Sequence, residues 1–140
     1  MDCTVSWLGN AGMAFSAETG SGHLINMDGA PEAGGRNLAP RPMELLLAGA
    51  GGCSAFDVVL ILQKARQAVS GCEVKIKADR ASEDPKVFTK IDLLFTVTGK
   101  DLDPAKVDRA VKLSHDKYCS ATAMLSKTAE LTYSIEVRSE

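Results

Sequence analysis

The chain has 140 residues, of which 45% are hydrophobic and 24% charged, with 16 Lys and Arg against 18 Asp and Glu. This composition excludes a disordered chain, and the length suits one globular domain, which we expect to span residues 1–140. The net charge of -2 argues against a nucleic-acid partner, because binding to a polyanion relies on a basic surface.

The N-terminal part of the chain predicts short strands followed by a loop. Polar and apolar residues alternate over 2–8, which is typical of a half-buried strand. Glycine-containing turns separate it from two further expected strands, over 13–17 and 23–27. We therefore expect a small antiparallel meander. The Gly- and Pro-containing stretch 28–41 predicts a long loop, and such loops often carry function.

A long apolar helix follows. Pro42 occupies the first-turn position that proline tolerates, and residues 45–62 are apolar on every side. A helix of this kind is either a membrane span or the centre of a core. Asp57 and the glycines within it favour a buried central helix, so we expect no membrane partner. Ser70 and Gly71 are predicted to end the helix.

The rest of the chain predicts two strands, two helices and a final strand. Residues 73–79 and 90–98 alternate in polarity and are joined by a turn, so they should form a hairpin. An Asp-Pro pair opens a helix over 103–117, a shorter helix is expected over 119–129, and the last strand over 131–137. Strands and helices are segregated, which predicts an α+β fold with antiparallel sheets.

The cysteines lack the spacing of a local metal site. They lie at 3, 53, 72 and 119, without a CxxC or CxxH pair, and we expect neither a metal nor a cofactor. No secretory signal opens the chain, which predicts a cytoplasmic protein with reduced thiols.

Two of the cysteines are candidates for reactivity. Cys53 follows a run of glycines, which would permit either close approach of another backbone or open space before the thiol; it could equally be a small core residue. Cys119 stands at an expected helix N-terminus, where the helix dipole favours the thiolate, although a simple packing role is the alternative.

The other cysteines and the histidines are weaker candidates for a catalytic role. Cys3 and Cys72 lie at strand starts, and we expect structural roles for both. His23 and His115 could serve as general bases by residue type. A break in the helix after His115 is expected to separate it from Cys119, which argues against a catalytic pair.

Two motifs resemble those of a known family. The stretch 41–59, RPMELLLAGAGGCSAFDVV, resembles the central-helix motif of the OsmC/Ohr family and is most similar to its YhfA-like branch. The stretch 113–120, LSHDKYCS, resembles the second cysteine motif of that family. The resemblance implies an OsmC-like α+β fold, with antiparallel sheets wrapped around a long buried central helix. It also implies an intertwined homodimer with active sites at the dimer interface, where the glycines would let two helices approach.

The resemblance further implies a cysteine-based reductase of small organic hydroperoxides in oxidative-stress defence. Cys53 would attack the peroxide, Cys119 would resolve the sulfenic acid, and a dithiol reductant would restore both thiols. The family places a Glu directly after the helix-starting proline; here that residue is one position later, and Glu44 is assigned the third catalytic role. The cation that stabilises the thiolate would come from Arg36 or Arg41.

Two other functions are compatible with the same sequence. One is a non-catalytic dimer that binds a small apolar or lipid-like ligand in the interfacial cleft. The other is a purely structural homologue without a ligand. The reductase requires Cys53 and Cys119 within reach of each other, whereas the binding protein requires only an apolar pocket.

Overall fold

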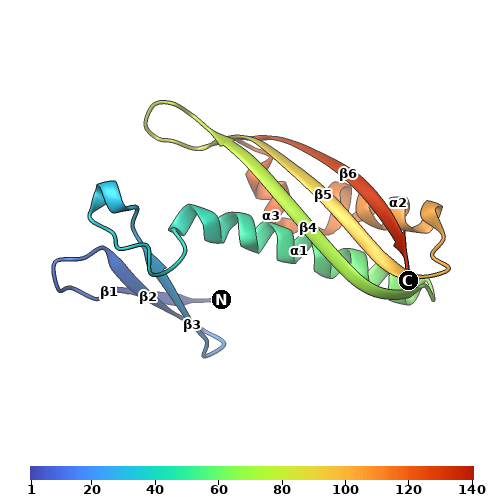
Figure 1. The fold of residues 1–140 in the computed structure, drawn as a ribbon, viewed down its shortest axis with the longest axis horizontal. Helices are drawn as coiled ribbons and strands as arrows, with labels where there is room; N and C mark the ends of the chain where they lie inside the picture. The colour runs from blue at the N-terminus through green and yellow to red at the C-terminus, as the bar shows by residue number, and fades with distance from the viewer. The chain divides into compact units, whose positions relative to one another are not determined.

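The computed structural model describes residues 1–140 and divides into two compact units, Met1–Leu47 and Ala48–Glu140. Each unit holds one three-stranded sheet, with strand orders β1-β2-β3 and β4-β5-β6 (Figure 1). The mixed α+β class is confirmed, while the single domain over 1–140 stays a prediction.

The first unit contains the expected meander. Its strands are β1 (Cys3–Trp7), β2 (Ala14–Thr19) and β3 (Leu24–Asp28), and both neighbouring pairs are antiparallel. In the turn between β1 and β2, the Trp7 indole nitrogen Nε1 donates a hydrogen bond to the Gly12 carbonyl at 2.9 Å. The alternation over 2–8 and the glycine-containing turns therefore predicted these strands correctly. The expected half-burial of the first strand is wrong for the single chain, because every residue of β1 is exposed.

The loop after β3 is built around one buried carboxylate. Asp28 accepts hydrogen bonds from the backbone N–H groups of Gly29, Arg36 and Leu38 at 2.8, 3.0 and 3.1 Å. These bonds, led by the one from Leu38, hold the pKa of Asp28 below its usual value although burial opposes them. Together with the short 3-10 helix η1 (Pro31–Ala33), they give the predicted loop a defined course.

The central helix α1 (Pro42–Lys64) begins with one half of a capping box, the bond made by its glutamate. The Glu44 carboxylate accepts a hydrogen bond from the Arg41 backbone N–H at 2.9 Å, which satisfies a donor that the first turn leaves free. Pro42 takes the first helical position, as predicted.

The helix ends earlier than the sequence predicts. Arg66 adopts a left-handed conformation with φ 57°, and the Gln67 N–H donates to the Leu62 carbonyl at 2.9 Å. This is the hydrogen bonding of a Schellman motif, which usually has glycine where Arg66 stands. The predicted end at Ser70 and Gly71 is wrong, because both residues belong to strand β4.

Within one chain, α1 is buried along a single stripe. The buried positions follow one another at near-helical spacing: Ala50, Gly51, Ser54, Val58 and Leu62. The helix has the length and hydropathy of a membrane span, and only 28% of its most apolar 18-residue window is buried in the chain. The expected burial on every side is therefore wrong for the isolated chain, which leaves one apolar face of α1 uncovered.

The second sheet is mixed rather than antiparallel. Strands β4 (Ala68–Arg80) and β5 (Phe88–Lys100) form the predicted hairpin. Strand β6 (Glu130–Ser139) pairs with β5 in parallel, so the expectation of only antiparallel pairing is wrong for this strand. The helical connection between β5 and β6 carries the chain back along the sheet, which makes the parallel direction possible.

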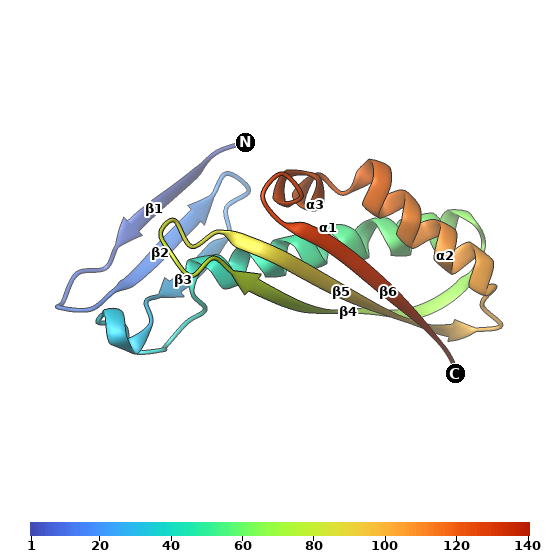
Figure 2. The same ribbon diagram turned by 90° about the horizontal axis from the view of Figure 1, so that it is seen from above.

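That connection consists of α2 (Pro104–Leu113), a π-helical turn η2 (Ser114–Tyr118) and α3 (Ser120–Leu125). The Asp103 side chain accepts a hydrogen bond from the Ala105 N–H at 2.9 Å and caps α2 as predicted. Helix α3 begins where expected and ends four residues before the predicted boundary. Figures 1 and 2 show α1 and the α2–α3 segment side by side on the same face of the second sheet.

Candidate active site

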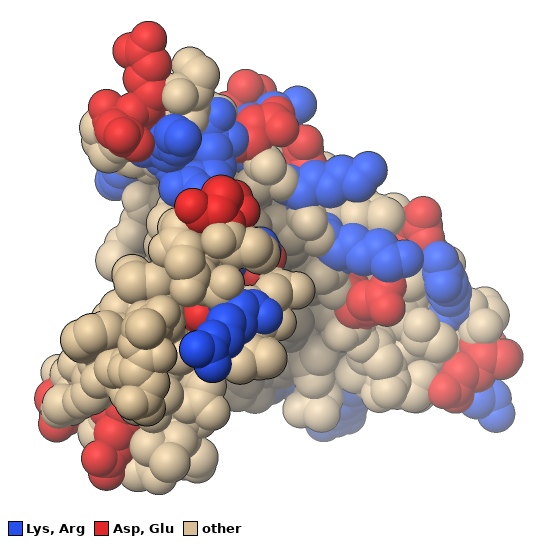
Figure 3. Space-filling view, turned by 60° about the vertical axis from the view of Figure 1, so that its left-hand side comes forward, with Lys and Arg blue, Asp and Glu red and all other residues tan.

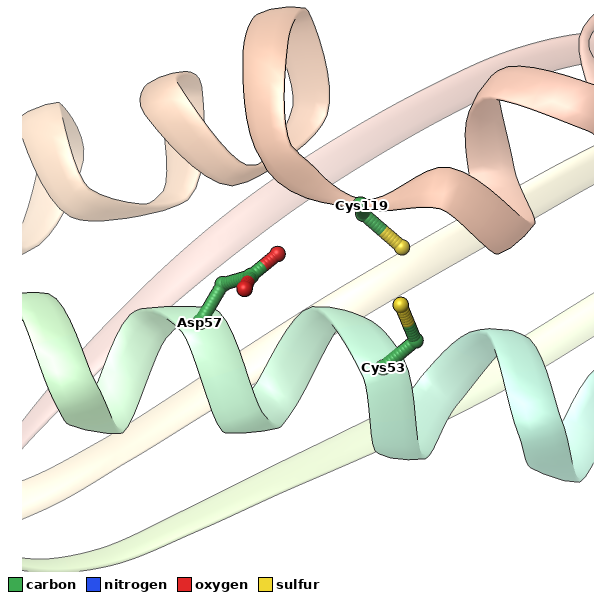
Figure 4. A group of neighbouring side chains, drawn as sticks. All are labelled: Cys53, Asp57 and Cys119. Carbon is green, nitrogen blue, oxygen red and sulfur yellow. The ribbon is translucent and has the colours of Figure 1, made fainter. Parts of the chain in front are cut away.

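The structure brings together the two predicted cysteines. Cys53 projects from the middle of α1, and Cys119 is the N-cap residue of α3. Their sulfur atoms and a carboxylate oxygen of Asp57 all lie within 4.8 Å of one another. Figure 4 shows the two thiols pointing toward each other, with Asp57 directed into the same gap from the next turn of α1. All four cysteines of the chain are free thiols.

Cys119 occupies a hydrogen-bonded and buried position, with 2% of its surface exposed. Its Sγ accepts hydrogen bonds from the Ser54 hydroxyl at 3.2 Å and from the Thr122 backbone N–H at 3.5 Å. Burial opposes ionisation, but the hydrogen bonds from Ser54, Thr122 and Cys53 outweigh it and lower the pKa of Cys119. The Cys119 thiol, with its lowered pKa, faces the half-buried Cys53.

A π-helical turn directs a second hydroxyl into the site. The Ser114 hydroxyl donates to Asp57 Oδ2 at 3.1 Å and lies 3.4 Å from the Ser54 carbonyl. The Cys119 N–H closes the turn by donating to the Ser114 carbonyl at 2.9 Å. These bonds join α1 to the helical connection on both sides of the thiol pair, and they fix the orientation of the Asp57 carboxylate.

One glycine explains how α1 approaches the sheet. A Cβ atom at Gly51 would lie 2.8 Å from Cδ1 of Ile76 on β4, closer than side chains pack. Cβ atoms at Gly49 and Gly52 would meet no atom within 4 Å. Glycine at position 51 therefore leaves room for the end of the Ile76 side chain, whereas the other two glycines lie on the uncovered face.

Sequence reasoning missed the role of Asp57. Its position four residues after Cys53 places the carboxylate on the same side of α1 as the thiol, which was the available signal. The other predicted catalytic residue, Glu44, lies outside the cluster in the first turn of α1. Its carboxylate is 3.4 Å from Nη1 of Arg41, and both side chains are largely exposed. The catalytic role of Glu44 stays a prediction.

The other candidate cysteines and the two histidines are not members of the cluster of Cys53, Asp57 and Cys119. Cys3 is exposed, and burial raises the pKa of Cys72, which disfavours its thiolate. His23 Nδ1 lies 3.0 Å from the Ser21 hydroxyl within its own turn. The His115 ring packs against Tyr133, with 5.0 Å between the ring centroids. Burial of Cys72 and the ring packing of His115 favour structural roles for these two residues, while the structural role of Cys3 stays a prediction.

A groove runs along α1 from Gly52 onward. Its volume is about 460 Å³, and it lies between the uncovered face of the helix and the start of β4. Its lining includes Gly52, Phe56, Val59, Leu60 and Cys72. An uncovered apolar surface of this kind suits either an apolar ligand or another protein surface.

Charged side chains show no concentration of one sign over the visible face. Figure 3 shows Lys and Arg interspersed with Asp and Glu, beside a broad uncharged area. The pattern agrees with the low net charge of the chain.

Comparison with known proteins assigns the family. The family model described as OsmC-like protein matches residues 34–134, and the chain belongs to this family. Protein YhfA of Escherichia coli strain K12 is 52% identical over 137 residues, which cover 98% of both chains.

Solved structures agree with this assignment. A hypothetical protein from Aquifex aeolicus is 31% identical, with a TM-score of 0.85 and coverage of 99% of this chain and 96% of that one. An organic hydroperoxide resistance protein OsmC from Legionella pneumophila is 15% identical and covers 97% of both chains, with a TM-score of 0.68. At that identity the Legionella structure supports the fold alone. The expected OsmC-like family and fold are thus confirmed.

Proposed function

We propose that this protein is a thiol-dependent reductase of small organic hydroperoxides that acts in oxidative-stress defence. The observation that carries the proposal is the juxtaposition of two free thiols from different elements, with their sulfur atoms within 4.8 Å. We take the substrate class from the name of a protein with the same fold, the organic hydroperoxide resistance protein from Legionella pneumophila.

In the first step, Cys53 attacks the substrate because it is the more accessible thiol of the pair. Its thiolate sulfur bonds to the terminal peroxide oxygen while the O–O bond breaks. The alkoxide leaves, takes up a proton and departs as an alcohol, and Cys53 becomes a sulfenic acid.

In the second step, Cys119 resolves the sulfenic acid. The Cys119 thiolate forms a bond to the Cys53 sulfur while the S–O bond breaks, and the hydroxide leaves as water after taking up a proton. The hydrogen bonds from Ser54 and Thr122 suit this step, because they favour the thiolate form of Cys119 beside Cys53. A dithiol then reduces the disulfide and restores both thiols.

We further propose that the protein works as a homodimer in the cytoplasm. The uncovered face of α1 carries Phe56, which is 68% exposed, next to open space at Gly49 and Gly52. A second copy seated there would cover this apolar surface. Glu44 and one of Arg36 and Arg41 would complete the site, and a reducing compartment would keep the four thiols free.

The test is consumption of cumene hydroperoxide in the presence of dithiothreitol or lipoamide. We expect turnover by the wild type and by Cys3→Ser, and loss of turnover in Cys53→Ser. Mass spectrometry after one equivalent of peroxide should detect a Cys53–Cys119 disulfide. Two free thiols after prolonged exposure would contradict the proposal.

The groove supports a second candidate function, the binding of an apolar ligand without catalysis. Its volume of about 460 Å³ lies in the range of small-molecule sites, and its lining is mainly apolar. Binding of a fluorescent fatty acid by Cys53→Ser, combined with absent peroxide turnover in the wild type, would favour this function.

A further inference from the structure

We propose that Cys53, Cys119 and Asp57 form a binding site for a thiophilic divalent cation, and specifically for Zn²⁺. The sequence offers no metal motif, because the three residues lie in two segments of the chain that only the fold brings together. The three candidate ligand atoms, two sulfurs and one carboxylate oxygen, already lie within 4.8 Å of one another.

The geometry is close to what zinc requires. Zn–S bonds of about 2.3 Å in a tetrahedral site place two sulfur ligands roughly 3.8 Å apart. The separations of at most 4.8 Å therefore need only small rotations of the side chains to match. Figure 4 shows all three side chains directed into one gap, so that a cation placed there would meet each of them.

The donor set favours zinc over harder cations. Two thiolates select a soft or borderline metal, whereas Mg²⁺ and Ca²⁺ prefer sites made of oxygen ligands. Binding would release the thiol protons to the solvent. Three protein ligands would leave a fourth position for water, as in zinc sites that remain open.

The surroundings resemble the outer shell of a metal site. The Ser114 hydroxyl donates to Asp57 Oδ2 at 3.1 Å and holds the carboxylate in place. The Ser54 hydroxyl and the Thr122 N–H donate to Cys119 Sγ, which would stabilise the charge of a coordinated thiolate. Such partners orient the ligands and typically change metal affinity by 10- to 100-fold.

The direct test measures Zn²⁺ binding by the reduced full-length protein against a chromogenic chelator, without peroxide. We expect one Zn²⁺ per chain. Each of the variants that remove a ligand should bind Zn²⁺ at least about 100-fold more weakly, which is a larger loss than removal of an outer-shell hydrogen-bond partner causes. These variants are Cys53→Ser, Cys119→Ser and Asp57→Asn. Ser114→Ala should bind roughly tenfold more weakly. Cys3→Ser and Asp108→Asn, which alter exposed residues, should bind like the wild type.

Two further measurements distinguish the loss of a zinc ligand from misfolding as the cause of weaker binding. Asp57→His retains a zinc ligand and should restore most of the binding. Co²⁺ should give the thiolate charge-transfer absorption of the wild type in Asp57→His, and about half of its intensity in either single cysteine variant. Unchanged Zn²⁺ affinity in Asp57→Asn or in Cys53→Ser would overturn the proposed site.

A consequence that rests on the proposed function is that zinc competes with oxidation. A cation held by both sulfurs should slow formation of the Cys53–Cys119 disulfide at least tenfold when one equivalent of cumene hydroperoxide is added. Equal rates with and without bound Zn²⁺ would contradict this regulatory role. Metal-free protein that forms no disulfide would refute the reductase, while the chelator experiment would still decide the metal site.

Discussion

The two faces of α1 differ in what they contact: the inner face packs within the protomer, and the outer face is uncovered. On the inner face, Gly51 permits contact with Ile76, and Ser54 is bonded to Cys119. On the outer face, Gly52 has open space and Phe56 is largely exposed. The inner face builds the protomer and its thiol pair, and the outer face, which the chain leaves uncovered, carries the proposed dimer interface.

The strongest test of this difference is Gly51→Leu. We expect it to destabilise the protomer by about 3 kcal/mol, because its Cβ atom would lie 2.8 Å from Cδ1 of Ile76 and the rest of the leucine side chain would need further room. Urea unfolding followed by circular dichroism measures the loss, and failure to recover folded protein would be its extreme form.

The matched control is Gly52→Leu. Space for a side chain exists at this position in the single chain, so the protomer should fold, and any defect should appear in the dimer. Sedimentation of the two variants separates these effects. Equal stability of Gly51→Leu and the wild type would contradict the inner-face packing, and an intact Gly52→Leu dimer would contradict the proposed interface.

A second variant examines the outer face alone. Phe56→Ser removes an aromatic side chain that is 68% exposed in the chain and that we expect to be buried on association. The dissociation constant of the dimer should rise roughly thirtyfold, corresponding to about 2 kcal/mol of lost burial. Met124→Ser, at a residue that is 69% exposed on α3, is the control. Analytical ultracentrifugation that finds both variants equal to the wild type would place the interface elsewhere.

The smallest expected effect concerns the inner-face hydroxyl. Ser54→Ala removes a donor to Cys119 Sγ and should raise the pKa of that thiol, with a loss of about 1 kcal/mol where the thiolate is populated. The folded-state pKa is lowered, so the thiolate stabilises the fold fully above the unfolded value of about 8.5. That contribution disappears as the pH falls through the folded-state pKa.

The stability difference between the wild type and Ser54→Ala should therefore grow as the pH rises through the folded-state pKa of Cys119, and it should level off above the unfolded value of about 8.5. Urea unfolding across this range measures it, and the far-ultraviolet thiolate absorbance reports the pKa. Ser126→Ala, which removes a hydroxyl bonded to the Ala123 carbonyl at 2.8 Å, is the control. A difference that stays constant with pH would show that Ser54 does not stabilise the thiolate.

Local sequence patterns predicted the elements that are determined by neighbouring residues. Alternating residues identified the strands, and Pro42 and Asp103 marked helix starts. The end of α1 was missed because Arg66 adopts the left-handed conformation without being a glycine. The parallel pairing of β6 depends on the path of a distant connection, which no local pattern records.

The residues of the candidate site likewise fall into those that the sequence predicted and those that only the fold reveals. Its two cysteines could be predicted from the sequence because each lies in a recognisable segment. Their partners could not, because Ser114 reaches α1 only through the π-helical turn. Asp57 looked like an isolated charge in an apolar helix until the fold placed it beside both thiols.

Because of the path of the chain between the two thiols, a Cys53–Cys119 disulfide would change the stability of the folded protein. Cys53 precedes the β4–β5 hairpin and Cys119 follows α2, so a bond between them would enclose these elements in a covalent ring. Closing a ring of this size restricts the unfolded chain and would favour the folded state by about 4 kcal/mol, if the native geometry accepts the bond without strain. The oxidised protein would then resist denaturant longer than its reduced form, and each reduction by a dithiol would return the molecule to its more easily unfolded state.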